Sequence, residues 1–391
     1  MQTKKFILNF FLLFVSTSVS LLSISLVLEI LLPTRQTKIE MILRKKRLEI
    51  DYPLKIKSAT NGFFPLYYPL KTREHFLRSR YYPAGTLAHT QTFYCNEGYG
   101  LISFKSDRFG LRNDEEDWDE IRNKGATFFI GDSFTQGACV EKEFVVTELF
   151  SNLLNENALN LGSAGNGPYE YVALLKNVVK PIISSNLGKE TSTILLFYNN
   201  DNVRLEETLD QHLSSSQPIA EVNLNGFINV SKEYLSTLNE TITKHYPTNS
   251  RDILDELKSN RERSTAYRVL TLYPLRSIIK KQRNTKKSSL STNPSIKAIS
   301  ELHSICNPKT LCTPYVVYIP NSNYWDPTNE AGNEYKLLLE KTSNSLSIEF
   351  LDSSSSINPN EKSNYAPIGP HLSKEGYRKL ANFIASKVNQ K

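Results

Sequence analysis

From residue 126 to the C-terminus, short apolar runs alternate with segments of helical periodicity. The apolar runs predict strands at 126–130, 158–161, 192–198, 314–319 and 346–351. Apolar residues at helical spacing predict helices at 143–155, 169–180, 329–341 and 373–388. Strands that alternate with helices in this way build a mainly parallel sheet that is covered on both faces. We therefore expect an α/β fold of three layers, αβα, around a five-stranded sheet.

The N-terminus predicts a membrane anchor. Phe6 to Leu28 holds no charged residue, and a bilayer-spanning helix needs about 20 apolar residues. The run exits into Leu-Glu-Ile-Leu-Leu-Pro-Thr, a poor cleavage site, which favours a single-pass signal anchor over a cleaved signal peptide. Lys4 and Lys5 precede the run, but 35–47 is more basic. The positive-inside rule alone would therefore place the main domain in the cytoplasm.

The chain divides into three parts by composition. Residues 1–33 form the tip and the anchor, 34–120 form a juxtamembrane linker and a Tyr/Pro-rich wrapping segment, and 121–391 form the main domain. A polar, helical insertion interrupts this domain at about 203–300. Within it, 251–287 carries eleven Lys/Arg and four Asp/Glu. This basic face suits anionic lipid or polysaccharide, or an ordinary solvated surface, and no nucleic-acid motif accompanies it.

A strand-to-helix junction holds the first candidate for chemistry, in the stretch "FFIGDSFTQGACV" at 128–140. Ser133 lies where the apolar strand ends and a helical period follows. Ligands of open α/β sheets bind at the carboxyl ends of strands, so a hydroxyl at this place is positioned for nucleophilic attack. The alternative is a Ser that only caps the helix.

Three further stretches fall at ends of predicted elements on the same side of the sheet. "LNLGSAGNGPYEY" follows the second strand, "LLFYNNDN" ends the third, and "PIGPHLSKEGYRKLA" precedes the last helix. Each could be a turn, a cap or a surface loop. Together, in this order, they supply the donors and the base that an acyl-transfer site needs.

These four blocks resemble those of the SGNH (GDSL) hydrolase superfamily. The resemblance covers 126–388 and implies Ser133 as nucleophile and His371 as base. It also implies an oxyanion hole made by the backbone N–H groups of Ser133 and Gly165 and the side chain of Asn200. The upstream stretch "SDRFGLRND" is similar to the lead-in of membrane-anchored members found with bacterial envelope polysaccharide genes.

The resemblance implies a flavodoxin-like sheet and a serine-dependent esterase or O-acyltransferase. Its substrate would be an acylated, above all acetylated, envelope carbohydrate or glycolipid. No metal or organic cofactor is implied, and the catalytic domain would be periplasmic. The alternative is a non-catalytic protein of the same fold that binds carbohydrate or assists assembly.

One position departs from the family pattern, which has an Asp three residues before the His. Here that position is Ile368, followed by Gly369 and Pro370. His371 would then work in a dyad, receive a carboxylate from elsewhere, or catalyse weakly. We expect a Ser133–His371 dyad whose ring N–H donates to a backbone carbonyl. Asp352, at the end of the fifth predicted strand, is the possible third member.

The four cysteines are Cys95, Cys139, Cys306 and Cys312, without a C-x-x-C pair or a zinc spacing. An even number allows two disulfides in an oxidising compartment, although four free thiols would suit a cytosolic protein equally well. We predict bridges from Cys95 to Cys139 and from Cys306 to Cys312, with the domain on the outer side of the membrane. The first bridge would tie the Tyr/Pro-rich segment beside the site.

Overall fold

The computed structural model describes residues 2–31, 42–43, 45–67, 75–76, 79–185, 187–203, 216–262, 270, 272, 293–307, 310–325 and 329–389. Its centre is a parallel sheet of five strands in the order β10-β9-β6-β4-β5. These strands are β4 (Ala126–Gly131), β5 (Ala158–Gly162), β6 (Thr191–Tyr198), β9 (Cys312–Ile319) and β10 (Glu349–Asp352). Numbered along the chain, their spatial order is 2-1-3-4-5, which is the flavodoxin-like order. The predicted fold class is confirmed.

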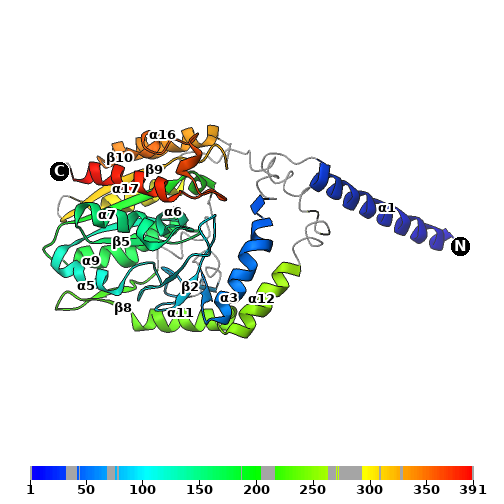
Figure 1. Ribbon diagram of the computed structural model, residues 1–391, viewed down its shortest axis with the longest axis horizontal. Coiled ribbons are helices and arrows are strands. Elements are labelled where there is room, and N and C mark those ends of the chain that lie inside the picture. Colours follow the sequence, from blue (N-terminus) through cyan, green and yellow to red (C-terminus); the bar gives the residue numbers. More distant parts are fainter. Residues whose placement is uncertain are drawn as a thin grey trace.

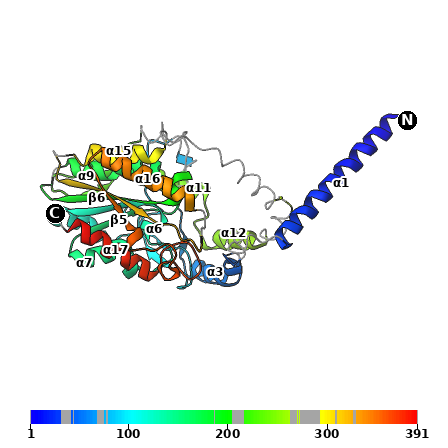
Figure 2. The ribbon, with the colours of Figure 1, turned by 90° about the horizontal axis from the view of Figure 1, so that it is seen from above.

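Helices cover both faces of this sheet (Figures 1 and 2). On one face lie α7 (Val146–Leu154) and α17 (Lys374–Val388), and on the other lie α8 (Pro168–Leu174), α9 (Lys180–Ser184), α15 (Pro294–Ile305) and α16 (Asn329–Ser345). Neighbouring side chains of β4 alternate between the two cores, with Phe128 and Ile130 in one and Phe129 in the other. Because side chains of a strand alternate in direction, a strand buried on both faces is apolar throughout.

The helix predictions hold with shifted ends. The helix expected at 143–155 begins with a 3₁₀ turn at Lys142–Phe144 and continues as α7. The helix expected at 169–180 is longer, because a π-helical turn at Leu175–Val179 joins α8 to α9. Ser373 caps α17, since its side chain accepts a hydrogen bond from the backbone N–H of Gly376.

The segment before β4 packs onto the main core. It contains α3 (Tyr52–Thr60) after a π-helical turn at Arg47–Asp51, strands β1 (Phe64–Pro65), β2 (Gln91–Phe93) and β3 (Ser103–Lys105), and α5 (Glu115–Lys124). β2 and β3 form an antiparallel hairpin and β1 pairs with β2. Phe109, Leu111 and Trp118 are at most 1% exposed and belong to the core that covers one face of the large sheet.

The insertion contains more than helices. A two-stranded sheet of β7 (Ala220–Val222) and β8 (Ile228–Val230) precedes α11 (Lys232–His245) and α12 (Ser250–Glu262). Tyr234 and Leu238 of α11 are fully buried in the main core. Most of the basic stretch 251–287 lies outside the described residues.

The N-terminal helix α1 (Gln2–Leu31) contains a stretch, Asn9–Val27, whose length and mean hydropathy of 2.2 suffice to cross a membrane. A signal sequence has the same properties, so α1 is an anchor or a signal by composition.

Candidate active site

Ser133 is the first residue of a four-residue helix, α6 (Ser133–Gln136), that follows β4 directly. The turn is held by Asp132, whose side chain accepts a hydrogen bond from the backbone N–H of Phe134 at 2.9 Å. β4 is the middle strand of β6-β4-β5, so the hydroxyl lies at the carboxyl edge of the sheet, where Ser133 is 9% exposed.

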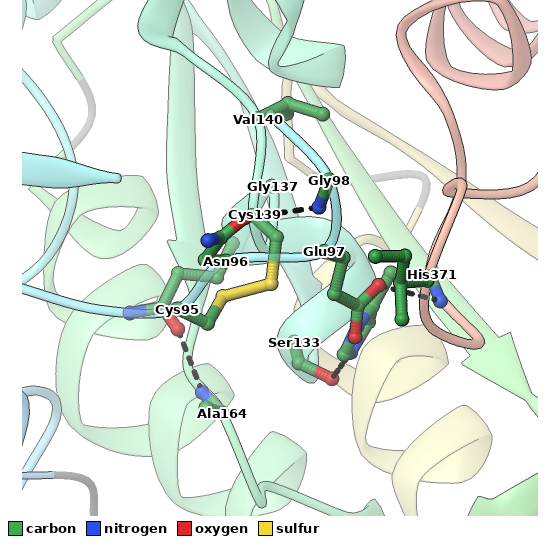
Figure 3. The surroundings of a disulfide bond; sticks show 12 residues. Cys95, Asn96, Glu97, Gly98, Ser133, Gly137, Cys139, Val140, Ala164 and His371 are labelled. Atoms are coloured by element: carbon green, nitrogen blue, oxygen red, sulfur yellow. Dashed lines mark hydrogen bonds and ion pairs between the residues drawn. A yellow bond between two sulfur atoms is a disulfide. The ribbon is translucent and has the colours of Figure 1, made fainter. Parts of the chain in front are cut away.

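The predicted partners, Ser133 and His371, are hydrogen-bonded. The Oγ of Ser133 lies 2.9 Å from Nε2 of His371, and Nδ1 of His371 lies 2.8 Å from Oε1 of Glu97 (Figure 3). In a neutral imidazole one nitrogen donates and the other accepts. With Nδ1–H donating to the carboxylate, Nε2 is free to accept the proton of the Ser133 hydroxyl. This is the geometry of a nucleophile, a base and an orienting acid.

Glu97 comes from the tip of the β2–β3 hairpin. The tip is folded by Asn96, whose Oδ1 accepts the backbone N–H groups of Gly98 and Gly100 at 2.9 and 3.1 Å. The loop before His371 then docks on the tip, because the N–H of Ile368 donates to the carbonyl of Glu97 at 3.0 Å. The N–H of His371 also lies 3.3 Å from Oε2 of Glu97. Both carboxylate oxygens therefore face His371.

The structure corrects two expectations about the third member. Asp352 accepts hydrogen bonds from Nζ of Lys336 and the N–H of Ser354, each at 2.9 Å, and takes no part in holding His371. The expected dyad with a backbone carbonyl is also wrong, since a carboxylate occupies Nδ1. Of the three possibilities left open by the missing Asp, a carboxylate from elsewhere in the chain is the one observed.

Gly369, in the loop before His371, lies directly against the side chain of Glu97. A Cβ on Gly369 would lie 1.9 Å from Cδ of Glu97 and 2.2 Å from both its carboxylate oxygens. The Glu97 carboxylate thus occupies the volume that any other side chain at 369 would fill. The absence of a side chain at 369 therefore leaves room for an acid that arrives from another segment.

The two other oxyanion candidates lie at the same edge of the sheet as Ser133. Gly165 is in a turn after β5, with φ +85°, and the N–H of Asn166 closes this turn on the carbonyl of Ser163 at 3.0 Å. Asn200 lies in a 3₁₀ turn after β6, Asn199–Val203. β5 and β6 both pair in parallel with β4, so the ends of all three strands converge.

The Asn and Asp side chains of the Asn-Asn-Asp sequence after β6 have different environments. Asp201 is fully buried and accepts hydrogen bonds from the hydroxyl of Tyr171 at 2.9 Å and the N–H of Tyr198 at 3.1 Å, which fixes the turn. The buried Oδ1 of Asn200 has no hydrogen-bond partner within the described residues. The same is true of both side-chain amide atoms of Asn166, which is 1% exposed. Buried amides without partners are costly, and in folded proteins they call for an explanation such as a bound ligand.

The stretch "SDRFGLRND" packs against the C-terminal end of α6. Arg112 donates to the carbonyls of Gly137 and Val140 at 2.7 and 2.9 Å, at the end of α6 and just beyond it. Burial lowers the pKa of its guanidinium to about 10. The fully buried Asp107 has a raised pKa because of desolvation, opposed by hydrogen bonds from Asn113 and Trp118. This stretch therefore supports the backbone around Ser133 and takes no direct part in the proposed chemistry.

Both predicted disulfides are present. Cys95 is bonded to Cys139 and Cys306 to Cys312, with Cα–Cα distances of 5.0 and 4.7 Å. Among the described residues, one grouping of possible metal ligands coincides with the site and consists of Glu97, Cys139 and His371. Metals bind the thiolate of cysteine, and the Cys139 sulfur is held in the bridge. The oxidised site therefore does not fit a metal.

A lysine upstream of the hairpin also contacts the loop that carries His371. Lys46 is 4% exposed, and its Nζ donates to the carbonyl of Ile368 at 3.3 Å, in the loop that carries His371.

No protein-family model and no curated protein sequence matches the chain. Among solved structures it is similar to a G-D-S-L family lipolytic protein from Desulfitobacterium hafniense, with 12% identity over 67% of this chain and 98% of that one and a TM-score of 0.33. It is likewise similar to the carbohydrate acetylesterase Est24 from Sinorhizobium meliloti, with 12% identity over 68% of this chain and 98% of that one and a TM-score of 0.37. An aryl esterase from M. smegmatis is similar with 11% identity over 68% of this chain and 98% of that one and a TM-score of 0.38. At such low identities and TM-scores, the assignment of function rests on the site itself.

Proposed function

We propose that this protein is a serine-dependent esterase in which Ser133 is the nucleophile, His371 the general base and Glu97 the orienting acid. The observation that carries the proposal is the continuous hydrogen-bonded row from Ser133 Oγ through both nitrogens of His371 to Glu97, at 2.9 and 2.8 Å. A serine hydroxyl becomes a good nucleophile when an imidazole takes its proton, and a carboxylate stabilises the resulting imidazolium.

The reaction is hydrolysis or transfer of an O-acyl group, and acetyl on an envelope carbohydrate or glycolipid is the proposed substrate. The carbohydrate class follows from the resemblance of the four blocks and of "SDRFGLRND" to envelope-polysaccharide members of the SGNH superfamily. Attack by Ser133 would form an acyl-enzyme and release the sugar hydroxyl. Water, or a second hydroxyl in the case of transfer, would then take the acyl group from Ser133.

The proposed location is the outer side of a membrane, with residues 1–33 as a single-pass anchor. The length and hydropathy of α1 support the anchor. Two disulfides support an oxidising compartment, here the periplasm. We retain 34–120 as a wrapping segment and 121–391 as the SGNH-like domain, with the addition that the wrapping segment contributes Glu97.

A fluorophosphonate probe tests the nucleophile directly, because it phosphonylates only an activated serine. We expect labelling of the purified protein, with the label mapped to Ser133 by peptide mass spectrometry. Labelling should be lost in Ser133→Ala and strongly slowed in His371→Ala. A folded protein that takes up no probe at Ser133 would favour a non-catalytic binding protein instead.

Asn200 is proposed to donate its side-chain N–H to the oxyanion. Asn200→Ala should lower kcat about 100- to 1000-fold with little change in KM, because this contact strengthens only in the transition state. Steady-state kinetics on an acetyl ester would measure both constants. A rise in KM at constant kcat would instead make Asn200 a residue of substrate binding.

Gly369→Ala should impair turnover through Glu97. The added methyl group cannot coexist with the carboxylate at its present place, so Glu97 must withdraw from Nδ1 of His371. The φ of Gly369 lies outside the left-handed region, so the backbone itself tolerates Ala. We expect kcat to fall at least about tenfold toward the value for loss of the triad acid, with an unchanged circular dichroism spectrum. Full activity of Gly369→Ala would show that Glu97 is dispensable or can shift without cost.

A further inference from the structure

The Cys95–Cys139 disulfide joins the two segments that carry the proposed acid and nucleophile. Cys95 precedes Glu97 by two residues, and Cys139 follows Ser133 by six. Figure 3 shows the bridge beside the Glu97–His371 pair. The Sγ of Cys139 lies within 4.8 Å of a carboxylate oxygen of Glu97 and of a ring nitrogen of His371. The bridge therefore lies directly beside the proposed acid and base.

The remaining contacts that hold the tip of the hairpin are noncovalent. β2 and β3 have three residues each, and β1, which pairs with β2, has two. Isolated hairpins of this size are marginal in water. The described hydrogen bonds of Glu97 lead to Ile368 and His371, in the loop before α17. The disulfide is the covalent connection between this tip and the chain that continues from Ser133.

We propose that the Cys95–Cys139 bridge is a positioning element for Glu97, so that the esterase has a complete triad only while the bridge is oxidised. The inference rests on the proposed function. A dithiol such as dithiothreitol would attack the S–S bond, leave two cysteine thiols, and itself become a cyclic disulfide, so that two electrons and two protons pass to the protein. The freed hairpin tip then no longer holds the carboxylate on Nδ1, and a Ser133–His371 dyad remains.

The second disulfide offers a matched control. Cys306 directly follows α15 and Cys312 begins β9, at the amino end of that strand. β9 is eight residues long, and at about 3.3 Å per residue its amino end lies some 23 Å from the carboxyl edge that holds the site. The described residues thus contain two bridges of similar chemistry, one beside Glu97 and His371 and one at the opposite edge of the sheet.

The experiment compares removal of each bridge with and without Glu97. The variants are C95A/C139A and C306A/C312A, each in the natural chain and combined with Glu97→Gln, assayed on p-nitrophenyl acetate below the midpoint of thermal unfolding of every variant. We expect C95A/C139A to lower kcat between about 10- and 1000-fold, because the upper limit is the loss of the triad acid itself. In the Glu97→Gln background the same removal should cost less than about twofold, since coupled residues are not additive. C306A/C312A should leave kcat within about twofold in both backgrounds.

A second measurement covers the case in which C95A/C139A fails to fold. In folded C306A/C312A only the site bridge remains, so activity can be followed against thiol count during titration with dithiothreitol and after reoxidation. We expect activity and bridge to be lost and regained together, with the acid limb of kcat/KM moving to lower pH on reduction, as in Glu97→Gln. Unchanged activity of the reduced protein would overturn the inference while the esterase stands. Equal losses with and without Glu97 would also overturn it, because the bridge would then act on general stability. Absence of any esterase activity in the oxidised natural chain would refute the proposed function instead.

Discussion

Ser133→Ala is expected to abolish ester hydrolysis while the protein stays folded. The hydroxyl contacts Nε2 of His371 at 2.9 Å at the edge of the sheet, and its loss leaves no nucleophile to form an acyl-enzyme. A fall in kcat of at least about 10⁴-fold is expected, as in serine hydrolases that lose this group. Initial rates on an acetyl ester, with active-site titration of the natural protein, would measure the change.

Folding is the necessary control for this substitution. The turn is held by Asp132 and not by the Ser133 side chain, so Ser133→Ala should unfold at nearly the same temperature as the natural chain. Retention of most activity in a well-folded Ser133→Ala variant would remove the basis of the serine-esterase proposal.

Glu97→Gln should produce the second large loss, a fall in kcat approaching 10⁴-fold. An amide keeps the size of the side chain but cannot stabilise an imidazolium, and its N–H₂ group favours the wrong tautomer of His371. The lost negative charge also makes the imidazole harder to protonate, so the acid limb of the kcat/KM profile should move to lower pH. A pH series from about pH 4 to pH 9 would show both effects.

Asp352→Asn is the matched control, because the same chemical change is made at the carboxylate that the sequence offered only as a possible third member. Asp352 pairs with Lys336 and caps the 3₁₀ turn Ser353–Ser355, so its loss should change kcat by less than about threefold, on the scale of ordinary surface pairs. If Asp352→Asn proved the more damaging of the two, the assignment of Glu97 would be wrong.

The sheet and the position of Ser133 at its carboxyl edge could be predicted because their signals are local. β4 and most of β6 are apolar runs that the parallel sheet buries on both faces, and such runs stand out from the sequence. Ser133 follows a strand directly, and His371 precedes a helix whose cap, Ser373, is itself recognisable. Parallel strands bring their carboxyl ends to one edge of the sheet, whereas the role of His371 was implied by the resemblance of its block and not by its position.

Glu97 could not be predicted in the same way because it is 274 residues from His371 and lies in a segment without periodicity. Its hairpin is held by packing, an Asn turn and a disulfide, none of which leaves a regular pattern in sequence. Two indirect signals existed. Gly369 stands next to the position of the missing Asp, and Glu97 lies two residues from a cysteine that was predicted to bridge to the nucleophile segment.

The insertion shows a different limit. Its composition predicts helices, and α11 and α12 are helical, but the β7–β8 hairpin has strands of only three residues. Such short strands carry no usable alternation, and their pairing is decided by contacts with distant parts of the chain. The sequence around Tyr234 of α11 likewise gives no local signal of its position in the core. Its hydroxyl accepts a hydrogen bond there from the backbone N–H of Ala84.

The contact of Lys46 with Ile368 limits how far the proposed active site can lie from the membrane end of α1. Lys46 follows Leu31, the last residue of α1, by fifteen residues, and even a fully extended chain of that length spans only about 50 Å. An enzyme anchored by α1 would therefore carry out its chemistry in a thin shell of solution above the bilayer. Substrates carried on lipid would enter that shell by lateral diffusion at high effective concentration. A free polymer would be accessible only along the stretches that pass close to the membrane, so that distance from the surface would itself select which acyl groups are removed.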